Sequence, residues 1–400
     1  MKRFVLKNGM VVLIKQRPTN SVAIELTVKV GSNYEHDKIR GLSHFLEHML
    51  FEGTNNRSAR QIANEIESIG GEINAFTDNE RTSYYVVVLH KYFDRALDVI
   101  SDIIQNPVFD EKIIDKERKV VLDEINLTTD DPKIHQWVLF QKLLYKKHNC
   151  RYPVYGTVDA VSGLKRKDFL EFYSKYYVPN NMILSIVGNI DERVLPKIEK
   201  AFMLIPKPVR KRKMIIEPKQ VKSLSLVEKR KLMHSYIVLG YKSVPRSHPD
   251  SFVFDVIRSV LGRGQSSKLF QEIRTKRGLA YSVGAHYEAN VDYGWIAIYV
   301  GTDKKNLPKI RKIVLEEVQH LKKLSQEDLE DAINFLEGDY LLSNEDNHTM
   351  ADTMSVWDIM GNLDMVDEYV KNVKEVSQAD VKRVVNKYFK HPVFIVIKQI

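Results

Sequence analysis

Cysteine is almost absent from this 400-residue chain, which contains a single one, Cys150. One cysteine excludes an intrachain disulfide and fits a reducing compartment. It lies in the polar stretch HNCRYPVYG, where a bystander thiol is the simpler interpretation and a catalytic thiol the alternative. Glycine and proline are also scarce, at 18 and 13 residues, which excludes a collagen-like or low-complexity chain. The composition predicts globular domains, and the length allows two.

Long apolar runs are missing as well. No stretch approaches the roughly 20 consecutive apolar residues that a membrane-spanning helix needs. The first residues, MKRFVLKNGMVVLIKQRP, begin with charge, and Lys7, Asn8 and Gly9 interrupt their apolar pattern. This pattern predicts a strand, a turn and a second strand, not a secretion signal. We therefore expect a soluble, cytoplasmic protein without a membrane partner.

The sequence has no signature of nucleic-acid binding, although its formal net charge is +9. It contains no zinc knuckle, aromatic-basic RNA motif or helix-turn-helix pattern. The densest basic run, KPVRKRK at residues 207–213, lies between two apolar-periodic halves and beside Pro206 and Pro208, which favours an interdomain linker. The stretch GRGQSSK lacks the spacing of a phosphate-binding loop. We expect no nucleic-acid partner.

What the sequence does contain is an internal repeat. Residues 161–189 and 376–400 each include a serine, an amphipathic helix, a Lys-Tyr-aromatic triplet, a proline and an apolar strand. Two further pairs of segments, one strand-turn-strand and one strand-helix, match at nearly the same offset of about 212 residues. Three collinear matches predict two similar domains, residues 1–206 and 222–400, joined by a basic linker at 207–221.

Each half mixes strands joined by short turns with long amphipathic helices. In GGEINAFTDNERTSYYVVVL, the residues TDNE separate two strand-like segments, which is typical of a hairpin and so of antiparallel pairing. We therefore predict an α+β fold made twice, in which each domain is a mostly antiparallel β-sheet with α-helices packed on one face.

The stretch GLSHFLEHMLFEGT, residues 41–54, places His44, Glu47 and His48 in an otherwise apolar helical pattern. Histidines four apart lie about 6 Å apart along nearly one face of a helix, so His44 and His48 can bind one metal ion together. A lone histidine is more often an ordinary core or surface residue, but the full H-x-x-E-H pattern is the signature of inverted zinc peptidases. The apolar stripe that anchors the helix consists of Leu42, Phe45, Leu46, Met49 and Leu50.

A catalytic zinc site needs a third protein ligand and a position left for water. In DEKIIDKERKVVLDEINL, residues 110–127, Glu117 and Glu124 fall on the apolar stripe of a predicted helix. The other members of this stripe are Ile113, Ile114, Val120, Val121 and Ile125. Carboxylates on a buried face are unfavourable unless paired or coordinated, so the alternatives are buried salt bridges to Lys or Arg and metal coordination. The two histidines upstream favour the metal site.

At these residues the chain resembles the pitrilysin-like inverzincin metallopeptidases, the family that includes mitochondrial processing peptidase and insulin-degrading enzyme. The likeness covers essentially the whole chain and is closest to the small prokaryotic members. It implies the duplicated α/β roll of the mitochondrial processing peptidase type, and one Zn²⁺ per chain held by His44, His48 and Glu124. It also implies that Glu117 supports the metal site without binding the ion.

The resemblance also assigns residues to the substrate. The family pairs the substrate backbone with an extended strand carrying an Asn-Ala pair and a nearby Thr, which fall on Asn74, Ala75 and Thr77. Its Arg and Tyr that help to bind substrate and stabilise the transition state fall on Arg274 and Tyr281, in LFQEIRTKRGLAYSV. The second half has no zinc motif where the first has one, which agrees with a family in which only one domain binds metal.

The expected activity is that of a zinc-dependent endopeptidase that cleaves unfolded peptides or short segments inside a dimeric chamber. We expect Glu47 to take the proton of a zinc-bound water and pass it to the leaving amine, while Tyr281 and Arg274 stabilise the oxyanion. Because the chain has both the zinc motif and the Arg/Tyr pair, we expect a homodimer, with a heterodimer of related subunits as the alternative. Two other functions stay open, a non-catalytic scaffold or peptide-binding subunit and a structural zinc site with four protein ligands.

Overall fold

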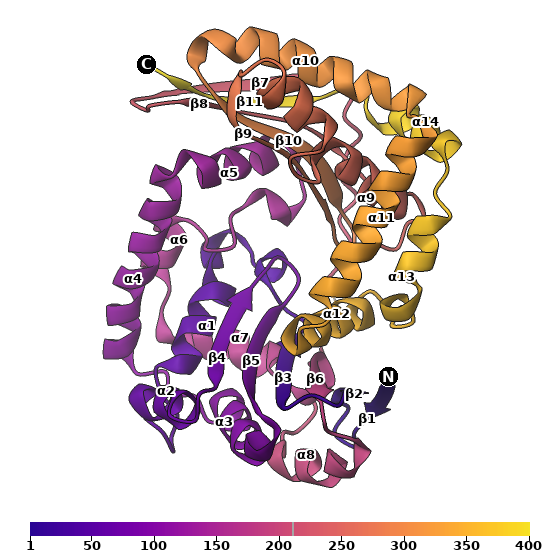
Figure 1. Cartoon of the computed structure of the whole chain (residues 1–400). Coiled ribbons are helices and arrows are strands. Elements are labelled where there is room, and N and C mark those ends of the chain that lie inside the picture. The colour runs from indigo at the N-terminus through magenta and orange to yellow at the C-terminus, as the bar shows by residue number, and fades with distance from the viewer. Residues whose placement is uncertain (210–211) are drawn as a thin grey trace. The chain divides into compact units, whose positions relative to one another are not determined.

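The computed structural model describes residues 1–209 and 212–400, which form two compact units. The first unit consists of Met1–Leu127, Tyr152–Lys213 and Ser343–Val366, and the second of Thr128–Arg151, Met214–Leu342 and Asp367–Ile400. Each unit contains one β-sheet and its own helices (Figure 1). No helix in the described residues is both long and apolar enough to cross a membrane.

The first sheet has six strands in the order β1-β2-β6-β3-β5-β4. They are β1 (Lys2–Val5), β2 (Val11–Gln16), β3 (Ser21–Val28), β4 (Glu72–Thr77), β5 (Thr82–Leu89) and β6 (Met182–Gly188). Neighbouring strands are antiparallel except β2 and β6, which run parallel. Residues 78–81 join β4 to β5, which confirms the predicted hairpin and leaves β4 at the edge of the sheet.

Apolar side chains of helices and strands form the core of the first unit. The helices are α1 (Leu42–Phe51), α2 (Ala59–Glu67), α3 (Phe93–Gln105), α4 (Glu111–Asp130), α6 (Val158–Gly163), α7 (Arg166–Tyr176) and α8 (Leu195–Ala201). On β3, Val22, Ile24 and Leu26 belong to this core. Alternate residues of a strand point to opposite faces, yet Glu25 and Thr27 are fully buried too. The second face of β3 is therefore covered as well.

A helix from the end of the chain provides this cover. Helix α12 (Asn347–Ile359) contacts β3 and β6, and Figure 1 shows it in dark yellow beside the indigo β3. The contact is polar: the hydroxyls of Ser185 on β6 and Ser355 on α12 share a hydrogen bond of 2.8 Å. Amphipathic patterning places polar residues of such a helix toward solvent, so this buried polar face departs from the usual pattern.

Buried charges also join α12 to the sheet. Arg81, just before β5, forms ion pairs with Asp352 at 2.5 Å and with Asp78 at 3.0 Å, and lies 3.7 Å from Oε1 of Glu25. His348 lies 3.4 Å from the other carboxylate oxygen of Glu25. Glu25 is fully buried, and it also accepts a hydrogen bond from the Thr27 hydroxyl at 2.9 Å, so its carboxyl group has several polar partners. The cluster thus makes the position of α12 specific.

Within the described residues, the second sheet repeats the strand order of the first without a counterpart of β1. Its strands are β7 (Leu224–Arg230), β8 (Ser235–Lys242), β9 (Ala280–Ala289), β10 (Gly294–Thr302) and β11 (Val393–Gln399). They lie in the order β7-β11-β8-β10-β9, and only β7 and β11 run parallel, as β2 and β6 do. The predicted duplicated α+β fold is confirmed, but the expectation of helices on one face only was wrong for the first sheet, because α12 covers its second face.

Helix α5, from the first half of the sequence, packs on β8 and β11 of this sheet. The helices that lie mostly in the second unit are α5 (Pro132–Leu144), α9 (Asp250–Gly262), a π-helix (Phe270–Thr275), α10 (Leu307–His320), α11 (Gln326–Ser343), α13 (Met365–Lys374) and α14 (Gln378–Tyr388). On α5, Phe140 lies over Gly240, where a Cβ would come within 2.5 Å of its ring. Each sheet thus carries one helix from the other half of the sequence.

The compact units differ from the contiguous domains predicted at 1–206 and 222–400, because α5 and α12 each belong to the unit of the other half. Within the predicted linker, 207–221, residues 210–211 lie outside the described residues. Arg212 is not exposed as expected of a linker residue, since its guanidinium pairs with the buried Glu80 at 2.9 Å. The extent of the linker stays a prediction.

Candidate metal centre

Helix α1 carries the H-x-x-E-H motif, and buried groups fix its first turn. The carboxylate of Glu35 accepts hydrogen bonds from the backbone N–H groups of Gly41, at 2.8 Å, and Ser43, at 2.7 Å. Burial raises the pKa of Glu35 to about 7. Gly41 has a φ of 93°, and a Cβ there would lie 2.5 Å from the carbonyl oxygen of Tyr155, so only glycine fits. The predicted stripe is buried as expected, at Leu42, Phe45, Leu46, Met49 and Leu50.

The side chains of His44, His48 and Glu124 converge. One potential ligand atom of each lies within 4.8 Å of the others. The Nε2 atoms of both histidines lie 3.7 Å from Oε2 of Glu124, and the imidazole centroids are 4.7 Å apart. Burial, and secondarily the nearby His48, lower the pKa of His44 to about 4. The His44 ring is therefore neutral at pH 7 and keeps a lone pair for a metal.

This donor set fits a tetrahedral zinc ion. Zinc bonds of about 2.0–2.2 Å to nitrogen and oxygen place ligand atoms about 3.4 Å apart in a tetrahedron, close to the 3.7 Å found here. Nε2 of both histidines faces the Glu124 carboxylate, so each ring turns one nitrogen toward the same point. Across the described residues the group has three members, which matches a catalytic zinc site with one open position.

Glu117 lies behind this group on α4. Its Oε2 is 3.6 Å from Nδ1 of His48, and its Oε1 is 3.1 Å from Nζ of Lys116. Lys116 also contacts Glu52, which follows the last residue of α1, at 3.2 Å. Glu117 thus contacts an exposed lysine and a histidine of the motif, and neither contact decides between a buried salt bridge and a metal site. No pattern in the sequence indicated Lys116, because exposed lysines on helices are common.

The buried face of α4 is narrower than predicted. Ile114, Glu117, Val121 and Ile125 are buried, at intervals of three and four residues. Val120 is 41% exposed, so its placement on this face was wrong. A single row at helical spacing leaves position 120 on the outer side.

Glu47 and Thr77 are in direct contact, since the Thr77 hydroxyl donates a hydrogen bond to Oε2 of Glu47. Burial raises the pKa of the Glu47 carboxyl, and this hydrogen bond opposes the rise. Thr77 is the last residue of β4. The strand predicted to bind substrate thus contacts the predicted base.

The other two residues predicted to bind substrate also lie on β4. Asn74 is paired with Tyr85 of β5, and Ala75 with the buried Tyr84, so the two side chains point to opposite faces of the sheet. Oδ1 of Asn74 accepts a hydrogen bond from the backbone N–H of Ala75 at 2.8 Å. This N–H is therefore satisfied locally on an edge strand that has strand β5 as its one neighbour in the described sheet.

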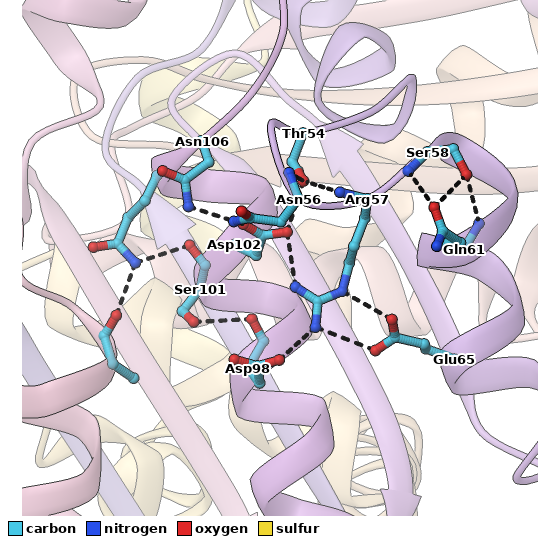
Figure 2. Close-up of polar contacts among 12 residues, drawn as sticks. Thr54, Asn56, Arg57, Ser58, Gln61, Glu65, Asp98, Ser101, Asp102 and Asn106 are labelled. Atoms are coloured by element: carbon cyan, nitrogen blue, oxygen red, sulfur yellow. Dashed lines mark hydrogen bonds and ion pairs between the residues drawn. The ribbon is translucent and has the colours of Figure 1, made fainter.

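An ionic network fixes the chain that follows α1. Figure 2 shows the guanidinium of Arg57 between Glu65 on α2 and Asp98 and Asp102 on α3, with distances of 3.0 Å to Glu65 and 2.8 Å to Asp102. The Thr54 hydroxyl donates a further hydrogen bond to Asp102 at 2.7 Å. Because Arg57 and Asp102 are largely buried, these bonds are stronger than surface ion pairs. They hold the chain after α1 against α2 and α3.

Arg274 and Tyr281 lie in the second unit. Arg274 is exposed on the π-helix, with its guanidinium 5.0 Å from the ring of Phe270. Tyr281 is 55% exposed and donates its hydroxyl to Asp303 at 3.1 Å, and this hydrogen bond raises the pKa of the phenol. The ring of His234 lies against Tyr281, with centroids 4.1 Å apart. Neither Asp303 nor His234 belongs to a motif, so sequence reasoning missed both.

Models of known protein families match both halves of the chain. A family model described as Insulinase (Peptidase family M16) matches residues 10–157. A second, described as Peptidase M16 inactive domain, matches residues 163–336. The metal motif falls in the first match, and Arg274 and Tyr281 fall in the second.

Relatives match over nearly their full length. An uncharacterized zinc protease of Bacillus subtilis (strain 168) is 32% identical over 393 residues, 97% of this chain and 96% of the relative. One of Rickettsia felis is 33% identical over 389 residues, 96% of this chain and 94% of the relative. The crystal structure of a protease from Helicobacter pylori has a TM-score of 0.94 at 25% identity and covers 99% of both chains. A peptidase M16 inactive domain from Pseudomonas fluorescens, with a TM-score of 0.89 at 18% identity, agrees in fold.

Proposed function

The chain belongs to peptidase family M16, the insulinase family, and from that premise we propose that it is a zinc-dependent endopeptidase acting on unfolded peptides or short segments. The observation that carries the proposal is the convergence of His44, His48 and Glu124 beside Glu47. The relatives named zinc proteases support zinc as the metal.

Three side chains would hold the zinc ion, namely His44, His48 and Glu124. When bound there, zinc lowers the pKa of a coordinated water and polarises the scissile carbonyl. Glu117 lies on the far side of the His48 ring, 3.6 Å from Nδ1, where a carboxylate orients the ring and makes it a better ligand.

Glu47 is the proposed general base and acid. It precedes His48, is absent from the ligand set, and is held by the Thr77 hydroxyl. Its carboxylate would accept a proton from water at Oε1 or Oε2 and later donate it to the leaving amine. The rise in the pKa of Glu47 caused by burial favours both transfers, because a base near the working pH accepts and releases protons readily.

The open edge of β4 is the proposed seat of the substrate backbone. A peptide added as a further strand would gain main-chain hydrogen bonds with little dependence on sequence. Thr77, at the end of this edge, would bring the peptide next to Glu47. Asn74 would have to release the N–H of Ala75 when a peptide pairs with this position.

We assign stabilisation of the oxyanion to Arg274 and Tyr281. A phenol has one proton, so Tyr281 cannot donate to Asp303 and to an oxyanion at the same time. As the oxygen of the reacting carbonyl gains charge, it must compete with Asp303 for the hydrogen bond of the Tyr281 hydroxyl. The guanidinium of Arg274 is exposed and can supply further N–H donors.

Replacing Tyr281 by phenylalanine should lower kcat about 100-fold with little change in KM, because an oxyanion donor acts mainly in the transition state. Steady-state cleavage of a fluorogenic peptide measures both constants. The matched control is Tyr388→Phe, which removes another phenol bonded to a carboxylate in the same unit, Asp250 at 2.8 Å. Equal rates for Tyr281→Phe and the wild type would exclude a role of this hydroxyl in catalysis.

Replacing Glu117 by glutamine should weaken zinc binding about 10- to 100-fold, as expected for a carboxylate that orients a ligand. The dissociation constant is measured by competition with a chromogenic chelator, independently of cleavage. Glu111→Gln, at an exposed position of the same helix, serves as the control. Unchanged zinc affinity in Glu117→Gln would show that this carboxylate serves only as a partner of Lys116.

The chain carries both the zinc-binding residues and the Arg274/Tyr281 pair, which supports a homodimer as the active form. In such a dimer the second domain of one protomer would complete the site of its partner across a chamber. A heterodimer with a related subunit is the alternative. The counter-proposal to an enzyme is a peptide-binding subunit without catalysis.

Digestion of a peptide library by the purified protein tests the proposed function. Zinc content and oligomeric state are measured on the same sample, and a chelator-treated portion serves as the control. We expect cleavage by the zinc-loaded dimer, loss of cleavage on chelation and recovery on addition of zinc. If a zinc-loaded dimer cut no peptide, the endopeptidase proposal would be wrong and the peptide-binding alternative would stand.

A further inference from the structure

A second concave site lies within the second unit, between α5 and the sheet. The pocket has a volume of about 600 Å³. Its lining includes Gln136 and Trp137 of α5, Ser282 and His286 of β9, and Trp295 and Tyr299 of β10. Ser282 directly follows Tyr281 in β9, although Tyr281 itself is not part of the lining.

Aromatic rings form the walls of this pocket. The Trp137 ring lies 5.4 Å from that of Trp295, 5.8 Å from Tyr299 and 5.9 Å from His286, measured between centroids. Trp137 and Tyr299 are only partly buried, and His286 is exposed. Large rings left at a concave surface are typical of a binding site, because they gain much contact area at little entropic cost when a ligand covers them.

Glycines leave the sheet beneath the pocket without side chains. A Cβ at Gly284 would lie 2.6 Å from the Tyr299 hydroxyl, and one at Gly301 would lie 2.7 Å from Oγ of Ser282. Side chains at these two positions would displace the rings and hydroxyls above them. The aromatic side chains therefore lie across a bare sheet surface and leave the cavity open.

Two buried polar atoms on the lining residues lack partners. Nε1 of Trp295 and Oε1 of Gln136 have no hydrogen-bond partner among the described residues, and the two residues are 2% and 4% exposed. The amide nitrogen of Gln136 is already used by the carbonyl of Lys133, at 2.9 Å. A buried N–H donor and a buried acceptor without partners are unfavourable. A bound amide group, which has one acceptor and one donor, would satisfy both once the two side chains turn toward the cavity, because neither atom is accessible in this structure.

The charge of the pocket favours a neutral ligand. One basic residue, Lys133, and one acidic residue, Glu288, line it. Neither an anion nor a cation is selected by these groups.

We propose that this pocket binds an aromatic residue of a peptide, with its ring against Trp137 and Tyr299 and its amide paired with Trp295 and Gln136. That the peptide is the substrate rests on the proposed function; the affinity for an aromatic amide does not. The pocket then gives the endopeptidase a preference for peptides that contain an aromatic residue.

The natural fluorescence of the protein tests this proposal directly. Of the three tryptophans, Trp137 and Trp295 line the pocket, whereas Trp357 is buried in the first unit. N-acetyl-phenylalanine amide, titrated into the whole protein with excitation at the red edge, should change the emission saturably. For a ligand of this size we expect a Kd on the order of 1 mM. N-acetyl-alanine amide and 2-phenylethanol should bind at least about tenfold more weakly, because each lacks one of the two recognised groups.

Two variants and a control complete the test. Trp137→Ala should raise the Kd of the phenylalanine probe about tenfold or more, since it removes a wall. Gln136→Leu should abolish the preference for the amide probe over 2-phenylethanol. Lys142→Ala, at an exposed position of the same helix, should bind like the wild type. No saturable change with the wild-type protein, or equal binding by Trp137→Ala, would overturn the proposal even if the protein cleaves peptides. If the protein bound the probe saturably but cleaved no peptide, the proposed function would be wrong and the proposed binding by the pocket would stand.

Discussion

Replacing Glu47 by glutamine should reduce kcat/KM for peptide cleavage about 1,000-fold while leaving zinc in place. General acid–base catalysis contributes about 10²- to 10⁴-fold, and a neutral amide can neither accept nor return the proton. Zinc is retained because Glu47 is outside the group formed by His44, His48 and Glu124. The amide oxygen of glutamine can still accept the hydrogen bond of Thr77, so the shape of the site is preserved.

Cleavage assays and metal analysis on the same preparation check this prediction. Glu67→Gln, at an exposed position near the end of α2, is the control for loss of a carboxylate. Cleavage by Glu47→Gln at the wild-type rate would refute the assigned base. Loss of both zinc and cleavage would instead place Glu47 among the groups that hold the metal.

Replacing Arg81 by methionine should destabilise the first unit by about 3–5 kcal/mol at pH 7, because removing one partner leaves buried charges uncompensated. Arg81 is the cation shared by Asp352 and Glu25, and it is largely buried. Burial already raises the pKa of Asp352 above its ordinary value. A carboxyl with a raised pKa contributes stability at low pH that is lost as the pH rises through its folded-state pKa. The charge of Arg81 lowers the pKa of Asp352, so removing Arg81 raises this pKa further. The difference in the free energy of unfolding between variant and wild type should therefore shrink toward acid pH.

Denaturant unfolding measures this effect in the first unit alone if Trp137 and Trp295 are first replaced by phenylalanine. The remaining tryptophan, Trp357 on α12, then reports on the helix that the charge cluster holds. Arg193→Met is the control, because its ion pair with Asp191 is exposed and contributes little. An equal loss of stability in both variants, or one that grows toward acid pH, would contradict the prediction.

The candidate metal site was largely visible in the sequence because local periodicity determines it. His44 and His48 are one helical turn apart, and Glu117 stands on the buried side of its own helix, where a carboxylate needs a partner, whereas Glu124 is only partly buried. The duplicated sheet was visible for a similar reason, since the repeated segments carry their strand pattern twice. Both inferences depend on residues close together in the chain.

The packing of α5 and α12, each on the sheet of the other half of the sequence, could not be predicted in the same way. An amphipathic pattern shows that a helix has a buried face but does not identify the surface that covers it. On α12, His348, Asp352 and Ser355 follow the pattern of a solvated face, yet they contact a polar sheet surface. Contacts between residues hundreds of positions apart, such as Arg81 with Asp352, have no local signal.

Helix α12 also determines when the first unit can be completed during synthesis. The last strand of the first unit, β6, ends at Gly188, but α12 does not begin until Asn347. At about 5–20 residues per second, a ribosome needs roughly 8–30 s to make the intervening chain. The nascent sheet must wait for α12 over this interval with one face open to water. Because that face carries Glu25, Arg81 and Ser185, it remains hydrated where an apolar face would invite aggregation.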